Sequence, residues 1–187
     1  MKKIILSIIA LTFVLVSCNK NKQSETTDSA AAQPEMKADV NVQTSFSINE
    51  IISNYLSLKN ALAKDDAKAA ASAGNAIVAV LEKLDMKNLS GDQMKNYMDV
   101  ADDTKEHAEH IGSNGGDIEH QREHFILLSK DVNDLITIFG TDQKLYLVFC
   151  PMADDDKGAQ WISETKEIKN PYFGAKMLTC GTVKKEL

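Results

Sequence analysis

Four stretches of this chain, between residues 48 and 139, repeat apolar side chains at intervals of three and four positions. That spacing places the apolar side chains on one face of an α-helix, and it restricts the fold more than any other feature of the sequence. Short polar or glycine-containing segments separate the stretches, which favours helices that turn back on one another. We therefore expect a mainly α fold: an up-down four-helix bundle over residues 46–141, followed by a small C-terminal β and loop cap over residues 142–187.

Several helix ends can be predicted from single residues. Ser47, followed by Glu50 three positions later, predicts a capped start for a first helix over residues 48–63. Asp117 predicts the N-cap of the fourth helix, and Gly140 suits its C-terminal end. The methionines of the third helix are expected to fill the core of the bundle.

The last part of the chain is expected to form short strands. Residues 144–150 are an apolar, β-favouring run and predict a strand. Residues 160–162 are expected to pair back on that strand, and residues 178–183 to form the last strand. This segment is too small to be independent, so we expect it to pack on the helices.

Sulfur-bearing side chains gather in the cap. Cys150 and Met152 form one group, and Met177 and Cys180 form a second group. A Cys-x-Met pair on a strand shares one face, and thiolate and thioether ligands select Cu(I) over harder cations. We expect Cys150 and Cys180 to bind Cu(I), with Met152 or Met177 as a third ligand. Aromatic side chains nearby would keep such a site dry, namely Tyr146, Phe149, Trp161, Tyr172 and Phe173.

An alternative interpretation of the same cysteines needs no metal. A Cys150–Cys180 disulfide would close a loop of about thirty residues and contribute roughly 3–4 kcal/mol to stability. The chain would then be a disulfide-stapled protein-interaction module of the cell envelope. No nucleophile triad, phosphate-binding loop or paired acid and base carboxylates stand out, so we expect no enzyme.

All four histidines lie between residues 107 and 124. His107 and His110 share one helix face, as do His120 and His124, and counting outward from the turn places His107 level with His120. Such a corner can bind a divalent metal, with His120 and His124 as candidate ligands. A solvated polar face, rich in glutamate, is the alternative. A di-iron bundle is not expected, because no Glu-x-x-His occurs.

The N-terminus has the layout of a secretory signal. Two lysines precede an apolar run, and the run ends in Leu15-Val16-Ser17-Cys18, which resembles the bacterial lipobox. We expect residues 1–17 to be a lipoprotein signal peptide and Cys18 to carry the lipid that attaches the protein to the membrane. The alternative is an ordinary signal peptide that is cut nearby.

Polar composition predicts a flexible tether over residues 18–45. No acidic residue directly follows Cys18, so outer-membrane attachment facing the periplasm is expected. The formal net charge of -6 argues against a nucleic-acid partner, because phosphate contacts need basic side chains.

Several motifs of the second half together resemble one known family. They are Arg122–Phe125, Tyr146, Cys150–Met152, Gly158–Trp161, Ile168–Gly174 and Met177–Gly181. In this order they are similar to domain of unknown function family 3347, over about residues 50–187. The resemblance implies a small envelope lipoprotein in metal homeostasis, and a metal-efflux adaptor protein as a partner. Gln160 stands where an aromatic residue is expected, and the resemblance supplies no functional residues.

Overall fold

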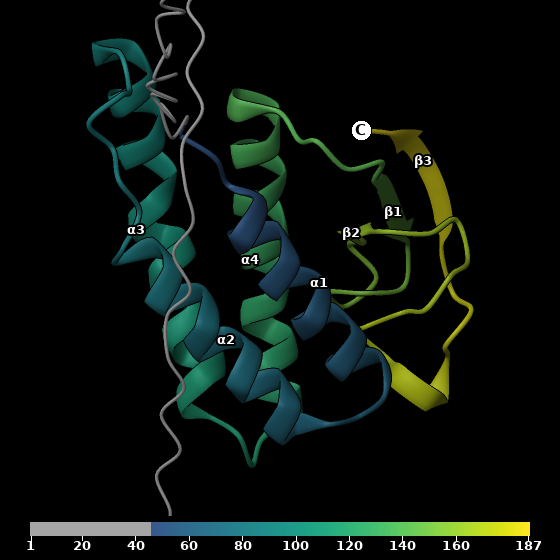
Figure 1. Ribbon diagram of the computed structural model, residues 1–187. Coiled ribbons are helices and arrows are strands. Elements are labelled where there is room, and N and C mark those ends of the chain that lie inside the picture. Colours follow the sequence, from purple (N-terminus) through teal and green to yellow (C-terminus); the bar gives the residue numbers. More distant parts are fainter. Residues whose placement is uncertain (1–45) are drawn as a thin grey trace, which may run out of the picture. The chain divides into compact units, whose positions relative to one another are not determined.

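A computed structural model describes residues 46–187, in which four helices precede a small antiparallel sheet (Figure 1). The predicted signal peptide, the predicted lipid-bearing Cys18 and the predicted tether lie outside the described residues. The elements are α1 (Asn49–Ala63), α2 (Ala67–Leu81), α3 (Gly91–Ser113), α4 (Ile118–Phe139), β1 (Tyr146–Cys150), β2 (Ala159–Ser163), the 3₁₀ turn η1 (Gly174–Lys176) and β3 (Thr182–Glu186). The expectation of a mainly α fold with a small β cap is confirmed. Within residues 46–187, no helix has the length and apolar character that a bilayer span requires.

Three helices begin at residues whose side chains accept a hydrogen bond from the first turn. Asp66 caps α2, and Asp117 caps α4 as predicted, by accepting from the backbone N–H of His120. Ser90 caps α3 in a reciprocal capping box with Gln93. These contacts satisfy backbone donors that a helix leaves unpaired, and so they determine where each helix starts.

The predicted start of the first helix is wrong in detail. Ile48, not Ser47, is the N-cap residue of α1, and it provides no side-chain cap. The Ser47 hydroxyl accepts from the N–H of Asn49 instead, at 3.2 Å. Ile48 is buried, so burial of its side chain at the helix start outweighs a capping contact.

Small residues allow α2 to lie close to the end of α3. A Cβ on Gly74 would come within 2.9 Å of the Ala108 carbonyl oxygen and 3.0 Å of the Gly112 nitrogen. Only glycine fits at this crossing, so α2 and α3 approach each other closely there. Figure 1 shows α1 and α2 lying obliquely across α3 and α4. The crossing supports the C-terminal end of α3, which carries His107 and His110.

The core follows the apolar stripes expected from the sequence. The buried side chains include Ile51, Ile52, Tyr55, Leu58 and Leu62 of α1 and Phe125, Leu128, Val132 and Leu135 of α4. The third helix is the exception, because Met98 is 45% exposed and Met94 is only half-buried. The expectation that its methionines fill the core is therefore wrong for Met98.

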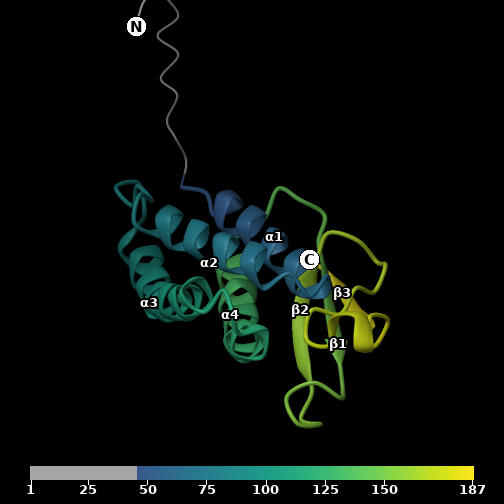
Figure 2. The same ribbon diagram turned by 90° about the horizontal axis from the view of Figure 1, so that it is seen from below.

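The cap is a three-stranded antiparallel sheet in the order β2-β1-β3. It packs against α4 and α1, and Figure 2 shows it on the side of α4 away from α3. The last strand begins later than the predicted residues 178–183, because residues before Thr182 form a turn that Gly181 ends at a φ of +144°.

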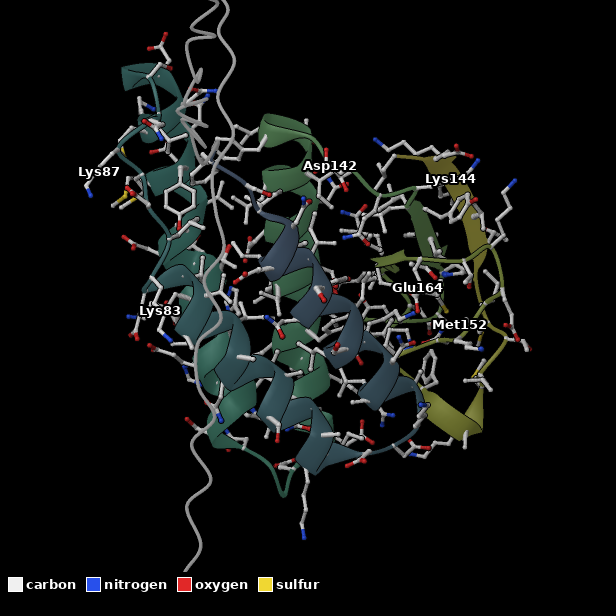
Figure 3. All side chains as sticks on the ribbon, in the orientation of Figure 1. Lys83, Lys87, Asp142, Lys144, Met152 and Glu164 are labelled. Carbon is white, nitrogen blue, oxygen red and sulfur yellow. The ribbon has the colours of Figure 1, made fainter. Side chains whose placement is uncertain are left out.

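Buried polar contacts fasten the cap to the helices. The Tyr55 hydroxyl lies 2.8 Å from Ser129 Oγ of α4 and accepts from the N–H of Ile162 in β2. The buried Lys59 ammonium donates to Glu164 at 2.7 Å, and Figure 3 shows Glu164 on the side of the cap that faces α1. Cap and helices therefore share one continuous core.

Candidate functional site

Cys150 and Cys180, here named the thiol pair, lie side by side in the cap. Cys150 is the last residue of β1 and is fully buried, and both are free thiols. Phe149 pairs with Thr182, so the register brings the start of β3 back beside the end of β1. Burial and the adjacent Cys150 thiol raise the pKa of Cys180 to about 11. The Cys180 thiol is therefore protonated at neutral pH, and a metal would have to displace its proton.

Asn170 holds the loop that carries Cys180. Its side-chain amide donates to the Cys180 carbonyl at 2.7 Å, and its N–H donates to the Leu178 carbonyl at 2.8 Å. A Cβ on Gly181 would lie 2.7 Å from the Trp161 ring, so this loop sits tightly on β2. Asn170 was not among the site residues predicted from the sequence, although it lies within the Asn-Pro-Tyr-Phe-Gly motif.

The two methionines are placed differently from the thiol pair. β1 ends at Cys150, so Met152 lies in the following turn and the argument that both share a strand face is wrong. Met152, labelled in Figure 3, is 47% exposed. It lines a surface hollow of about 410 Å³ together with Asp154–Asp156 and α4. Met177 follows η1 and is half-buried, and its carbonyl accepts from the N–H of Cys180.

Two of the five aromatic residues named from the sequence, Trp161 and Tyr172, pack on the inner side of the cap. Trp161 is almost fully buried and packs edge-on against Tyr172, with ring centroids 5.7 Å apart. Tyr172 in turn contacts Phe125 of α4 at 5.8 Å. Burial raises the pKa of Tyr172 well above its usual value, so its hydroxyl stays neutral. The buried Cys150 is thus part of the same apolar core as these rings, whereas Cys180 is half-buried.

His110 of α3 and His120 and His124 of α4 converge at the end of the helical hairpin, and we name them the histidine cluster. One ring nitrogen of each lies within 4.8 Å of the other two. The rings of His110 and His124 stack at 4.2 Å, and His120 meets His124 edge-on at 4.7 Å. His110 is exposed and the other two are half-buried, so solvent can reach the cluster.

His107 lies beside the cluster but contacts a different residue from the one expected. Its Nδ1 is 3.3 Å from Nδ1 of His124, whereas counting residues placed it level with His120. The counting assumed parallel helix axes and ignored which way each side chain leaves its helix. On its other side, His107 Nε2 lies 4.0 Å from Asp131 Oδ2.

The protein environment shifts the protonation of these groups. Burial, followed by neighbouring imidazoles, lowers the pKa of His124, and burial also lowers that of His107. Burial, then Asp103 and Asp134, raises the pKa of Asp131 to about 7. Neutral imidazole is the form that binds metal ions, so the lowered pKa of His124 favours its metal-binding form.

Sequence analysis did not include His110 and Asp131 among the site residues. The signal for His110 is its spacing, three positions after His107 on the same helix face. The signal for Asp131 is its position seven residues after His124, two turns along the same face of α4.

This mainly α domain with a small sheet at its C-terminal end belongs to a known family. The family described as Protein of unknown function (DUF3347) matches residues 51–144, half of the chain. The resemblance stated from the sequence is thereby confirmed. The match includes all four histidines and ends before the thiol pair. Comparison with curated proteins and comparison with solved structures gave no match.

Proposed function

We propose that this protein is a lipid-anchored metal-binding protein of the cell envelope whose thiol pair binds Cu(I). The single observation that carries the proposal is the adjacency of two free thiols, one buried and one half-buried, from distant segments of the chain. Cu(I) prefers thiolate sulfur and accepts low coordination numbers, so two adjacent thiols suffice as its principal ligands.

The chemistry of binding follows from the burial of the site. Each thiol gives up its proton as its sulfur binds the ion, and the high pKa of Cys180 makes binding weaker at low pH. The apolar layer of Trp161 and Tyr172 keeps water from the ion and stabilises the soft site. Met177 is the better third ligand, because its exposure is lower than that of Met152.

The cellular setting is part of the proposal. Lipid on Cys18 would attach the chain to the outer membrane, and residues 18–45 would tether the domain in the periplasm. There it would take up or deliver copper in metal homeostasis or efflux, with a metal-efflux adaptor as partner. We also propose that the helices form an up-down bundle, because each packs mainly on the next one along the chain.

The same adjacency of the thiol pair favours a second candidate function. Oxidation of both thiols would join Cys150 to Cys180 without distant chain movement and staple β3 to β1. The protein would then be an envelope interaction module with no metal.

An anaerobic Cu(I) competition titration of the reduced chain tests the proposal. We expect one tightly bound equivalent in the wild type and its loss in the Cys150→Ser, Cys180→Ser double variant. Cys18→Ser is the matched control, because it removes the third cysteine and should leave binding unchanged. A reduced wild type that competes for no Cu(I) would favour the stapled interaction module.

A further inference from the structure

We propose that the histidine cluster is a second metal site, separate from the thiol pair, that takes a borderline divalent cation such as Zn²⁺ or Cu²⁺. His110, His120 and His124 would be the ligands. His107 and Asp131 would not be ligands but would orient the ring of His124. The inference goes beyond the proposed Cu(I) function and does not depend on it.

The distances suit a metal of this size. Imidazole nitrogens bind Zn²⁺ at about 2.0–2.1 Å, so two ligands of a tetrahedral site lie about 3.3 Å apart. The three nitrogens are already within 4.8 Å of one another in the metal-free protein. Small side-chain rotations would close the remaining gap, and His110 is exposed and free to make one. Three neutral nitrogens favour zinc, copper and nickel over calcium or magnesium, which prefer oxygen.

Two groups can supply the fourth ligand of a tetrahedral ion at the histidine cluster. His120 Nδ1 lies 3.4 Å from Glu123 Oε2, so this carboxylate is close enough to complete the site. Water can take the same place, because the Glu123 side chain is 75% exposed. A site with an exchangeable fourth ligand releases its ion more easily than a closed site does.

His107 and Asp131 lie in series next to His124, and they determine which nitrogen of the His124 ring can bind the metal. With His124 donating from Nδ1 to Nδ1 of His107, the Nε2 lone pair of His124 is left for the metal. His107 Nε2 then carries a proton towards Asp131 Oδ2, which is buried and accepts no hydrogen bond from residues 46–187. Outer partners of this kind orient metal-binding imidazoles in proteins. A buried carboxylate oxygen without a hydrogen-bond partner costs folding free energy, and a role in orienting a metal ligand explains why this cost is tolerated.

The scaffold around the histidine cluster is firmly held. Gln121, between His120 and His124, donates to the carbonyls of Ala67 and Ile111 at 2.9 and 3.1 Å. These bonds join the start of α4 to α2 and to the end of α3. Asp117 fixes the first turn of α4 through the N–H of His120. The ligands therefore sit on elements whose relative positions are set before any ion binds.

Isothermal titration with Zn²⁺ tests the site in the Cys150→Ser, Cys180→Ser chain, purified without a histidine tag. This background removes the thiol pair. A failure of zinc to bind at the histidine cluster is therefore independent of whether the thiol pair binds Cu(I). We expect one equivalent of zinc, with affinity at least tenfold lower in His110→Ala and in His124→Ala. Glu109→Gln, an exposed neighbour of His110, is the matched control and should bind as the parent does.

The positioning role of His107 and Asp131 needs a readout that folding alone does not change. We expect His107→Phe and Asp131→Asn to weaken zinc binding about 10-fold to 100-fold. They should also shift the ligand-field bands of Co²⁺ bound in place of zinc, with circular dichroism unchanged. No zinc binding by the parent, or full affinity in His110→Ala, whose exposed side chain is not needed for folding, would overturn the site. Unshifted Co²⁺ bands in both outer variants would overturn the positioning role.

Discussion

At the scale of single residues, Asp131 is a carboxylic acid whose pKa rises strongly on folding. Its pKa rises to about 7 from an ordinary 3.8, because burial and the carboxylates of Asp103 and Asp134 disfavour its charge. Between these two pH values the folded state holds a proton that the unfolded state has lost. The free energy of unfolding therefore falls as pH rises through this window.

Asp131→Asn should stabilise the metal-free protein at pH 8, because the neutral amide avoids this cost. The upper limit of the gain is about 4 kcal/mol, from roughly three pKa units at 1.36 kcal/mol each. At pH 4 the two proteins should differ little. Urea denaturation in the presence of a chelator at both pH values measures this. Asp99→Asn, at an exposed ion pair of α3, is the control and should show no such pH dependence.

The candidate sites were predictable from sequence where helix periodicity applies, and less so elsewhere. His120 and His124 fall together because four positions make one helical turn. Met152 was misplaced because Pro151 removes a ladder donor and three aspartates at positive φ, Asp154–Asp156, turn the chain sharply. The contact between Cys150 and Cys180 depends on the pairing of β1 with β3, which no local pattern encodes.

At the scale of elements, one side chain joins α4 to both the helices and the cap. Arg122 is buried and donates to the carbonyl of Pro171 in the cap at 2.9 Å and to that of Leu62 at the end of α1 at 3.1 Å. It also pairs with Asp65, whose pKa is lowered first by the N–H of Ala175 and then by Arg122. Three separate segments therefore meet at one guanidinium.

Arg122→Met should destabilise the protein by about 3 kcal/mol, because two buried carbonyls lose their donor. Urea denaturation followed by circular dichroism measures the change. Lys95→Met is the matched control, since it breaks the exposed Lys95–Asp99 pair and should cost no more than about 0.5 kcal/mol. Equal small losses in both variants would contradict the structural role given to Arg122.

The sequence predicts the helices more accurately than it predicts the last strand, β3. The helices were found because each apolar stripe is long and regular. β3 was placed too early because the apolar residues Met177 and Leu178 precede it, whereas the strand itself, Thr182–Glu186, is mostly exposed. Its position is determined by hydrogen bonding to β1 across the sheet, so an exposed edge strand leaves little hydrophobic signal.

At the scale of the whole molecule, helices and cap should unfold together. Trp161 is the only tryptophan and lies buried in β2, so its fluorescence reports on the cap alone. Far-ultraviolet circular dichroism reports mainly on the four helices. Tyr55, Arg122 and the shared core link the two parts. We expect both signals to give the same midpoint on heating, as a two-state transition requires.

The outcome of that melt bears on both proposed metal sites. With one cooperative unit, zinc bound at the histidine cluster raises the midpoint seen by Trp161, although the metal lies on the helices. Thermal scans with and without zinc, on the Cys150→Ser, Cys180→Ser chain, measure whether zinc raises the melting temperature that Trp161 reports. Cys18→Ser in the same background controls for the proposed lipid. If zinc stabilises the helices while the cap melts at an unchanged temperature, the helices and the cap are two separate folding units. An ion bound at the histidine cluster could not then affect the thiol pair by stabilising the fold.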